Sequence, residues 1–342
     1  MTRAAVFGAG SWGTAFGAVL ADAGTDTTIW ARRPELAEAI RERHENPDYL
    51  AGVRLPDGVG ATTDPGAALD GADFVVLALP AQTLRENLSP WAPLIPADAV
   101  LVSLMKGVEL GTTKRMSEVI REVADVPADR VAVVSGPNLA GEIARRRPAA
   151  TVVACEHGPA AERLQDACLT GYFRPYTNPD VTGTELGGAV KNVIAIAVGM
   201  ADGMGLGDNA KASLITRGLA EMARLGGAQG ADPLTFAGLA GLGDLVGTCM
   251  SPLSRNRTVG EQLGRGRTLA EVTGELRMVA EGVKSSRSVL DLARKHHVYM
   301  PITEHVVAVL HGDMTPAQML RSMMTRGAKP ERHDAERGRP DD

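Results

Sequence analysis

Cysteine is scarce in this chain of 342 residues, its histidines do not cluster, and its basic residues are not in excess. Its cysteines are odd in number and lack metal-ligand spacing, and its histidines are scattered, so neither a disulfide scaffold nor a metal site is expected. Lys and Arg number 36 against 41 Asp and Glu, and the net charge of -5 argues against a nucleic-acid partner. Positive charge must therefore act locally, where small anions bind. The cysteines are Cys155, Cys168 and Cys249.

Long apolar runs are lacking as well. The first residues are strand-like, without the basic segment and apolar run of a secretory signal. The longest apolar stretch, around Lys191, is too short and too interrupted to span a bilayer. We therefore expect a cytoplasmic protein with no integral membrane segment, and the few unpaired cysteines agree with a reducing compartment.

Glycine, by contrast, is placed in a pattern near the N-terminus. Gly8, Gly10 and Gly13 match G-x-G-x-x-G between a strand-like run and a helical pattern. The first glycine permits a tight turn, the second lets the backbone approach a pyrophosphate, and the third allows close packing of helix and strand. The helix N-terminus would hold the anion. This context predicts dinucleotide binding, and the alternative is an ordinary glycine-rich loop.

Two arginines follow the second strand-like run, in the segment TTIWARRPE. An NAD site usually has an acidic residue here for the ribose 2′-OH, and this chain has Arg32 and Arg33 instead. A planar guanidinium suits a 2′-phosphate. The sequence thus favours NADPH over NADH, unless one of the arginines simply faces solvent.

The order of elements predicts two domains. Strand-like runs alternate with helical patterns up to about Tyr176, and from about Thr184 only helical patterns follow. We expect a Rossmann-type α/β domain with a doubly wound, mainly parallel sheet at residues 1–182, and an all-α domain at 183–326. The charged tail, 327–342, is expected to be disordered. The predicted strands are Ala4–Phe7, Thr27–Trp30, Phe74–Leu79, Val100–Ser103, Val131–Ser135, Thr151–Ala154 and Tyr172–Tyr176.

Lys191 interrupts a nearly continuous apolar helical pattern at the start of the helical part. Burial of an ammonium is costly and lowers its pKa, which suits a general acid or base. The alternative is a lysine whose head reaches water. Asp244, in a glycine-rich apolar stretch, is the obvious partner for Lys191, although it could instead cap a turn.

Further polar residues follow strands or open helices. Lys106, Gly136, Asn138 and Ala140 come after strand-like runs, where doubly wound sheets bind ligands, although loop or cap roles are alternatives. The run Ser254, Arg255, Asn256 combines a Ser N-cap, helix N–H groups and a guanidinium, which together suit a phosphate. Val279 and Glu281 lie further on, and Glu281 could accept a bond from a ribose or a carboxamide.

These segments together resemble the bacterial NAD(P)-dependent glycerol-3-phosphate dehydrogenases. The resemblance runs in order from near residue 1 to about 325, and many matched blocks are far more specific than the glycine motif alone. It is carried by the blocks GAGSWGTA, KG, SGPNLAGEIA, ELGGAVKNVIAIAVGMADG, NAKASLITRGLAEMARLG, TFAGLAGLGDLVGTC, SRNR, VAEGVKS and MPI.

The resemblance implies a role for each matched position. It implies reduction of dihydroxyacetone phosphate to sn-glycerol 3-phosphate for phospholipid synthesis, with Lys191 as the catalytic lysine and Asp244 as its partner. The dinucleotide-contacting positions are Ser11, Trp12, Arg32, Arg33, Tyr49, Lys106, Ala140, Arg255, Val279 and Glu281. The substrate-pocket positions are Lys106, Gly136, Asn138, Lys191, Asp244, Ser254, Arg255 and Asn256.

One position departs from the family pattern, because Asn138 stands where many members have serine. Two other functions stay open: an NADP-dependent dehydrogenase of a carboxylate-bearing hydroxy acid, and a non-catalytic NADPH sensor. A homodimer through the helical part is also expected, since small-residue helices such as Asn209–Leu225 permit close packing.

Overall fold

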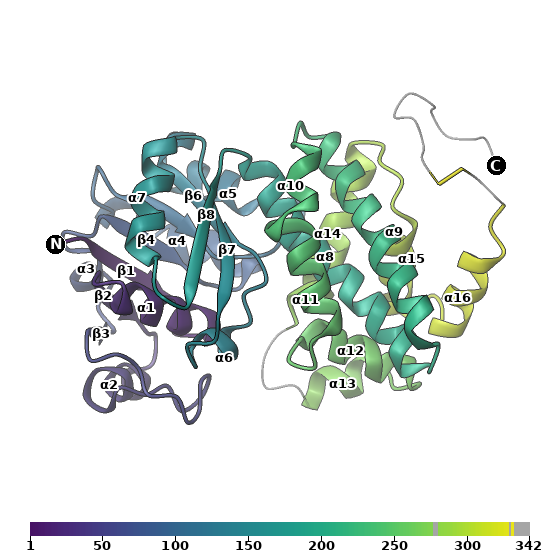
Figure 1. Ribbon diagram of the computed structural model, residues 1–342, viewed down its shortest axis with the longest axis horizontal. Coiled ribbons are helices and arrows are strands. Elements are labelled where there is room, and N and C mark those ends of the chain that lie inside the picture. The colour runs from purple at the N-terminus through teal and green to yellow at the C-terminus, as the bar shows by residue number, and fades with distance from the viewer. Residues whose placement is uncertain (276–279, 328–329, 332–342) are drawn as a thin grey trace.

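The computed structural model describes residues 1–275, 280–327 and 330–331, and it places an α/β half beside a helical half (Figure 1). The α/β half contains one eight-stranded sheet in the order β3-β2-β1-β4-β5-β6-β7-β8. All neighbouring strands are parallel except β6 and β7. The strands are β1 (Arg3–Phe7), β2 (Asp26–Trp30), β3 (Val59–Thr62), β4 (Phe74–Leu77), β5 (Val100–Ser103), β6 (Val131–Ser135), β7 (Ala149–Ala154) and β8 (Phe173–Asn178).

The central strands β1, β4, β5 and β6 are buried along almost every residue. Their runs are continuously apolar because helices cover both faces of the sheet. Alternate residues feed two separate apolar layers, so that Val6 joins Phe16 and Phe173 while Phe7 joins Trp91. These strands confirm the predicted doubly wound architecture. The pattern does not predict β3, since its sequence VGAT is short and contains glycine.

The predicted sheet is mainly parallel, and one connection departs from the parallel arrangement because β7 runs antiparallel to β6. Residues 136–148 join them and contain only the short helix α6 (Ala140–Ile143). A parallel crossover needs a dozen or more residues and usually a full helix. This segment instead folds back beside its own strand. The sheet is therefore mainly, and not wholly, parallel.

Short helices and 3₁₀ turns connect the strands, and several of them lie outside the predicted set. The helix α2 begins with a proline at its first turn, and α3 is a single turn capped by the Asp64 side chain. Both are too short for a clear helical period. The helices are α1 (Ser11–Asp22), α2 (Pro34–Arg43), α3 (Pro65–Leu69), α4 (Leu84–Leu88), α5 (Met116–Ala124) and α7 (Gly158–Cys168), with 3₁₀ turns η1 (Ala81–Thr83), η2 (Ala92–Leu94) and η3 (Ala128–Arg130).

The helical half packs around one long central helix, α8 (Val181–Gly203), which begins at the Asp180 cap and is buried from Gly183 to Ala201. The apolar sequence pattern predicts a helix over Glu185–Val198, so its predicted start is about one turn late. Around it lie α9 (Gly207–Gly227), α10 (Pro233–Ala237), the π turn η4 (Leu239–Gly243), α11 (Asp244–Met250), α12 (Arg255–Gly264), α13 (Leu269–Glu275), α14 (Glu281–Lys295), α15 (Pro301–His311) and α16 (Pro316–Met324).

Close backbone contact fixes α12 against α8. A β-carbon at Gly199 would lie 2.1 Å from the Arg257 carbonyl oxygen, and one at Gly260 would lie 2.0 Å from the Ile196 carbonyl oxygen. In the described part of the chain, α8 is the helix that is long and apolar enough to cross a bilayer, and 89% of its apolar window is buried. A central core helix meets that criterion equally well.

The buried carboxylate of Glu221, on α9, caps a neighbouring helix. It accepts the Ile302 and Thr303 backbone N–H groups at 2.6 and 3.2 Å, and the Thr303 hydroxyl at 3.0 Å, at the start of α15. Burial raises the pKa of Glu221 to about 7, although these hydrogen bonds oppose the shift. A raised pKa means that the folded protein holds this proton more tightly than the unfolded chain does.

Glu221 should therefore make the protein less stable as the pH rises. Its contribution to the free energy of unfolding is fully present below the unfolded pKa of 4.5 and is lost as the pH rises through about 7. We expect Glu221→Gln to flatten the decline in that free energy between pH 5 and 8, by up to about 3 kcal/mol. Denaturant titrations across this range measure it, with Glu304→Gln, an exposed carboxylate on α15, as the control. Parallel curves for wild type and Glu221→Gln would contradict the assignment.

Candidate functional site

The glycine loop between β1 and α1 has the shape that a dinucleotide phosphate needs. Gly8 has φ +121°, and a β-carbon on Gly13 would lie 2.0 Å from the Gly8 carbonyl oxygen. A β-carbon on Gly10 would meet nothing within 4 Å. Two glycines thus let the loop close on itself, and the middle one leaves open space at the N-terminus of α1. These residues fit a bound pyrophosphate.

A buried asparagine that the sequence analysis misses supports this loop. The Asn46 amide donates to the Ala9 carbonyl and to the Thr14 hydroxyl, each at 2.9 Å. Its oxygen accepts the Tyr49 N–H at 3.1 Å, and the Ser11 hydroxyl donates to the Tyr49 carbonyl at 3.1 Å. Asn46 thereby joins the glycine loop to the segment that carries Tyr49. Complete burial of a polar side chain is the signal, and it is visible only in three dimensions.

The predicted contacts Ser11, Trp12 and Tyr49 meet around the glycine loop, while the arginines after β2 differ from one another. Arg32 and Arg33 are both exposed. Arg33 forms an ion pair with Asp48 at 2.5 Å, which already offsets its charge. Of the two arginines, Arg32 is therefore better placed to attract the 2′-phosphate of a bound dinucleotide.

Asp244 lies between two lysines at the junction of the two halves. Its Oδ1 accepts a hydrogen bond from Lys191 Nζ on α8, and its Oδ2 accepts one from Lys106 Nζ, after β5, at 2.6 Å. Lys191 Nζ also donates to the Thr248 hydroxyl at 2.6 Å, and Lys106 Nζ donates to the Gly136 carbonyl at 3.0 Å. Asp244 and Lys191 are 1% and 6% exposed. Reasoning from the sequence pairs Asp244 with Lys191, but it does not find the contact with Lys106 or the role of Thr248.

The π turn η4 leads directly into α11 and sets the position of Asp244. Asp244 is the first residue of α11, and no side chain caps that helix, so the alternative role of Asp244 as a turn cap is wrong. Thr248 is one turn further along the same helix and therefore lies beside Asp244. A predicted helix at Asp244–Met250 could have revealed Thr248. Gly247, and the glycines at 238, 241 and 243 just before the helix, conceal the helical pattern.

The ammonium group of Lys191 is tuned by its surroundings. Burial lowers the pKa of Lys191 to about 8, Asp244 opposes this shift, and the nearby charge of Lys106 reinforces it. The group is then mostly protonated at neutral pH, yet it releases a proton more readily than an ordinary lysine. These are the properties of a general acid.

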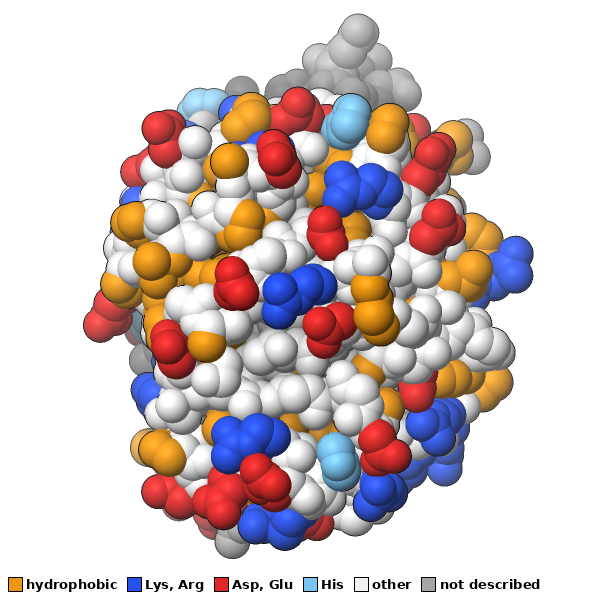
Figure 2. Space-filling model, turned by 90° about the vertical axis from the view of Figure 1, so that its left-hand side faces the viewer, with side chains coloured by type: hydrophobic (Ala, Val, Ile, Leu, Met, Phe, Trp, Pro, Cys, Tyr) orange, Lys and Arg blue, Asp and Glu red, His pale blue; other side chains and the backbone are white. Residues whose placement is uncertain are grey.

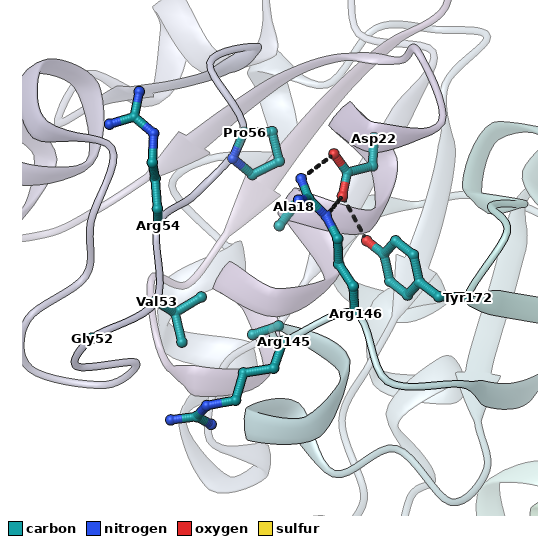
Figure 3. Close-up of a pocket in the computed structure, with 10 residues that line it drawn as sticks. Ala18, Asp22, Gly52, Val53, Arg54, Pro56, Arg145, Arg146 and Tyr172 are labelled. Carbon is teal, nitrogen blue, oxygen red and sulfur yellow. Dashed lines mark hydrogen bonds and ion pairs between the residues drawn. The ribbon is translucent and has the colours of Figure 1, made fainter.

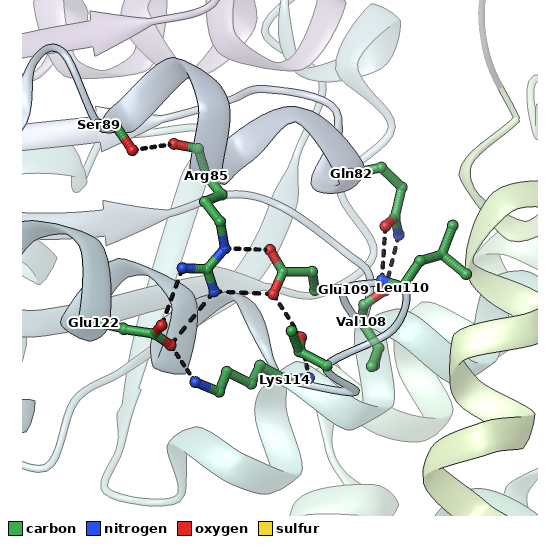
Figure 4. Close-up of polar contacts among 9 residues, drawn as sticks. Gln82, Arg85, Ser89, Val108, Glu109, Leu110, Lys114 and Glu122 are labelled. Carbon is green, nitrogen blue, oxygen red and sulfur yellow. Dashed lines mark hydrogen bonds and ion pairs between the residues drawn. The ribbon is translucent and has the colours of Figure 1, made fainter.

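The segment 108–110, which follows Lys106, is bound by Gln82 and Arg85 (Figure 4). The Gln82 carboxamide donates to the Val108 carbonyl at 2.8 Å and accepts the Leu110 N–H at 2.9 Å. Arg85 holds both oxygens of Glu109, at 2.9 and 3.0 Å. These contacts restrain the chain directly after Lys106.

The residues after β6 surround the same junction. Gly136 supplies the carbonyl that binds Lys106, and a β-carbon on Gly136 would lie 3.1 Å from the Thr151 α-carbon. The Asn138 amide donates to the Thr151 hydroxyl at 2.8 Å, while Asn138 Oδ1 is buried and has no hydrogen-bond partner among the described residues. Asn138 is not a helix cap, because Leu139 occupies that position before Ala140 opens α6.

The residues at the start of α12, Ser254 to Asn256, make different kinds of contact. The Ser254 hydroxyl accepts the Arg257 N–H at 3.2 Å and caps the helix, as predicted. The Asn256 amide donates to Asn192 at 2.9 Å, and its oxygen accepts the Gly282 N–H at 3.0 Å, so this side chain joins α8 to α14. Arg255 is the first residue of α12, and a guanidinium beside a helix N-terminus suits an anion.

The start of α14 faces Arg255. Burial raises the pKa of the Glu281 carboxyl, and Arg255 partly opposes the shift. Glu281 Oε2 is buried without a hydrogen-bond partner among the described residues, which suits a bond to a bound ligand. Val279, the other predicted contact in this segment, lies outside the described residues, as does most of the tail at 327–342.

Family models match both halves of the chain. The model for the NAD-dependent glycerol-3-phosphate dehydrogenase N-terminus matches residues 3–161, and the model for its C-terminus matches residues 180–321. The chain belongs to the family of NAD-dependent glycerol-3-phosphate dehydrogenases. This agrees with the resemblance carried by the sequence blocks.

Individual relatives agree along nearly the whole chain. The glycerol-3-phosphate dehydrogenase (NAD(P)+) of Streptomyces griseus is 67% identical over 330 residues, which cover 96% of this chain and 98% of the relative. That of Thermobifida fusca is 62% identical over 334 residues, which cover 97% and 99%. The crystal structure of the Coxiella burnetii glycerol-3-phosphate dehydrogenase superposes with a TM-score of 0.90 at 37% identity, covering 95% of this chain and 99% of that one.

The hollow in Figure 3 is separate from the cluster of Lys106, Lys191 and Asp244, none of which lines it. It has a volume of about 270 Å³ between α1, the 52–56 segment and the residues after α6. Asp22 binds Arg146 through both oxygens at 2.9 Å and accepts the Tyr172 hydroxyl at 2.8 Å, so its polar wall is internally paired. None of the predicted dinucleotide-contacting or substrate-pocket residues lines this hollow.

Charged side chains of both signs are mixed on the face that Figure 2 shows, with one small basic group at the lower right. Among the described residues, no group of three or more His, Cys, Asp or Glu side chains is placed to hold a metal ion.

Gly13 and Gly10 should respond differently to substitution, because a β-carbon at Gly13 meets backbone and one at Gly10 meets open space. Gly13→Ala should lower the thermal midpoint of the dinucleotide-free protein, because its β-carbon meets backbone at 2.0 Å. Gly10→Ala should leave that midpoint unchanged, since its β-carbon enters open space, yet weaken dinucleotide binding about tenfold or more by blocking the pyrophosphate. Thermal melts and fluorescence titrations with NADPH measure both effects. Equal loss of stability in the two variants would rule out this distinction.

Proposed function

We propose that this chain catalyses reversible hydride transfer between NADPH and dihydroxyacetone phosphate, giving sn-glycerol 3-phosphate for glycerophospholipid synthesis. The observation that carries the proposal is the buried cluster in which Lys106 and Lys191 share Asp244. The cluster lies where the sheet half meets the helical half. Full-length similarity to glycerol-3-phosphate dehydrogenases supports the same substrate.

The dinucleotide supplies the hydride when it is bound against the glycine loop. Reduction of the ketone turns its oxygen into an alkoxide, and Lys191 is the group whose lowered pKa suits donation of a proton to that oxygen. Asp244 accepts hydrogen bonds from both lysines and so holds each ammonium in place. Lys106 keeps a positive charge beside Lys191, which favours the anionic transition state over the neutral ketone.

The phosphate of the substrate suits the start of α12. Arg255 is a guanidinium at a helix N-terminus, and Ser254 keeps that helix end ordered. The Asn256 side chain acts indirectly here, since both of its polar atoms are bound within the protein. Binding energy from the phosphate would hold the ketone near Lys191.

The proposal also divides the chain into domains. We assign residues 1–182 to dinucleotide binding and residues 183–326 to substrate binding and catalysis. The exposed small side chains Ala212, Ser213 and Thr216 on α9 are consistent with a homodimer through the helical half, which stays a prediction. A cytoplasmic location likewise stays a prediction.

The first test is oxidation of NADPH with dihydroxyacetone phosphate, repeated with carboxylate-bearing keto acids of similar size. Turnover restricted to the phosphate substrate supports the proposal. Turnover only with the keto acids would assign the chain to a hydroxy acid dehydrogenase. NADPH binding without turnover of any of these substrates would favour a sensor.

Lys191 should be essential for turnover and should set its pH limit. We expect Lys191→Met to lower kcat by about 10²-fold or more, because the proton donor is lost. In the wild type, kcat for ketone reduction should fall as the pH rises through about 8, where Lys191 loses its proton. Lys284→Met, an exposed lysine on α14, is the control. Near-normal kcat in Lys191→Met would remove Lys191 from the mechanism.

The two arginines after β2 should contribute unequally to the preference for NADPH. Arg32→Ala should raise the KM for NADPH about tenfold and change the KM for NADH less than twofold, since a charge-assisted bond to the 2′-phosphate is lost. Arg33→Ala should have a smaller effect, because Arg33 is already paired with Asp48. Equal KM changes for both dinucleotides in Arg32→Ala would contradict a 2′-phosphate contact.

A further inference from the structure

A second buried carboxylate, that of Glu185, joins the two halves at a place that the mechanism above does not use. Glu185 lies in the first turns of α8 and is 4% exposed. Its Oε1 accepts the Ser117 backbone N–H at 2.8 Å. Its Oε2 accepts the Ser117 hydroxyl at 2.5 Å and Arg115 Nη1 at 2.9 Å. Arg115 and Ser117 belong to the α/β half, so this carboxylate is an interdomain contact.

The partners of Glu185 form a firm anchor. Arg115 is the N-cap residue of α5, and Ser117 is in its first turn, where unpaired N–H groups and the helix dipole favour an anion. Arg115 is itself held from the other side, because its backbone N–H donates to Glu118 at 2.7 Å. Three hydrogen bonds from Arg115 and Ser117 therefore fix where the carboxylate lies along the axis of α8 and how it is rotated.

The catalytic lysine lies on the same rigid helix. Lys191 follows Glu185 by six residues, which is about 9 Å along the axis of α8 and on a different face. Between them, a β-carbon at Gly188 would lie 2.8 Å from Ser135 Oγ and 3.2 Å from Lys106 Cγ. This glycine lets α8 approach the sheet half closely, but it has no side chain that resists sliding or rotation. Glu185 supplies that resistance.

We propose that Glu185 is a positioning residue, which holds α8 in the axial and rotational setting where Lys191 Nζ meets Asp244 and Thr248. This inference rests on the proposed function, in which Lys191 is the proton donor. A slide of α8 would move Lys191 relative to Lys106, which belongs to the other half. Misplacement of a reacting group by about 1 Å can cost about 10²-fold in rate.

The test compares three variants with the wild type. Glu185→Ala removes the anchor, and Glu185→Gln keeps an acceptor for the Ser117 N–H but loses the charge that binds Arg115. Glu118→Ala is the matched control, because Glu118 contacts the same Arg115 at 3.4 Å and lies within α5 itself. For each protein we would measure kcat, the Kd for NADPH, the thermal midpoint and the rate at which an amine-directed reagent labels Lys191.

Glu185→Ala should lower kcat about 10- to 100-fold, and Glu185→Gln about fivefold, at temperatures well below their thermal midpoints. The Kd for NADPH should change less than twofold, because the glycine loop is untouched. Labelling of Lys191 should become at least about threefold faster in Glu185→Ala, since its ammonium would leave Asp244 and Thr248. Glu118→Ala should keep kcat, the Kd for NADPH and Lys191 labelling within twofold of the wild type, while its thermal midpoint falls because the Arg115 N–H at the start of α5 loses its acceptor.

The proposal is overturned if both Glu185 variants keep kcat and Lys191 labelling within twofold of the wild type, or if Glu118→Ala loses as much. If Glu185→Ala does not fold, Glu185→Gln decides alone by the same criterion. Labelling does not depend on the substrate. A wild type that fails to turn over dihydroxyacetone phosphate would therefore refute the proposed function, while the labelling rates would still test the role of Glu185.

Discussion

The carboxylate of Asp244 binds one ammonium group from each half of the molecule. It is almost completely buried, and a buried ion is tolerated only when partners replace the water that it has lost. Lys106 comes from the sheet half and Lys191 from the helical half, so the contacts that neutralise Asp244 also join the two halves. Two ammonium groups against one carboxylate leave a surplus positive charge, which suits an anionic substrate and the alkoxide that forms during its reduction.

Close backbone contact makes that sharing possible. The central helix α8 reaches the π turn before Asp244 because a β-carbon at Gly187 would lie only 2.3 Å from the Ala240 carbonyl oxygen. Gly188 provides the same closeness to the strand ends that carry Ser135 and Lys106. Contacts between glycine and backbone bring surfaces together without fixing their register, so directional polar contacts have to do so. Gln82 supplies two such contacts to the segment that follows Lys106.

Several side chains in the helical half and around the glycine loop bind protein groups, and so stabilise the backbone that carries the predicted site residues. Asn256 joins α8 to α14, Arg33 is paired with Asp48, and Asn46 ties the glycine loop to Tyr49. Their burial or pairing explains why a ligand role drawn from sequence position alone can be indirect. Glu281, by contrast, has a buried Oε2 without a hydrogen-bond partner among the described residues, which suits a bond to a ligand.

The sequence by itself determines the alternating α/β part, the helical part and the chemistry of Lys191, Asp244 and the glycine loop. Each of these depends on local pattern: apolar runs, glycine spacing, or a charge in an apolar segment. Only the tertiary structure decides that β7 runs antiparallel, that Lys106 shares Asp244, and that Thr248, Asn46 and Glu185 take part. These features pair residues distant in sequence, or lie in glycine-rich segments whose helical pattern is weak. Their partners are set by how the two halves pack, which no local pattern encodes.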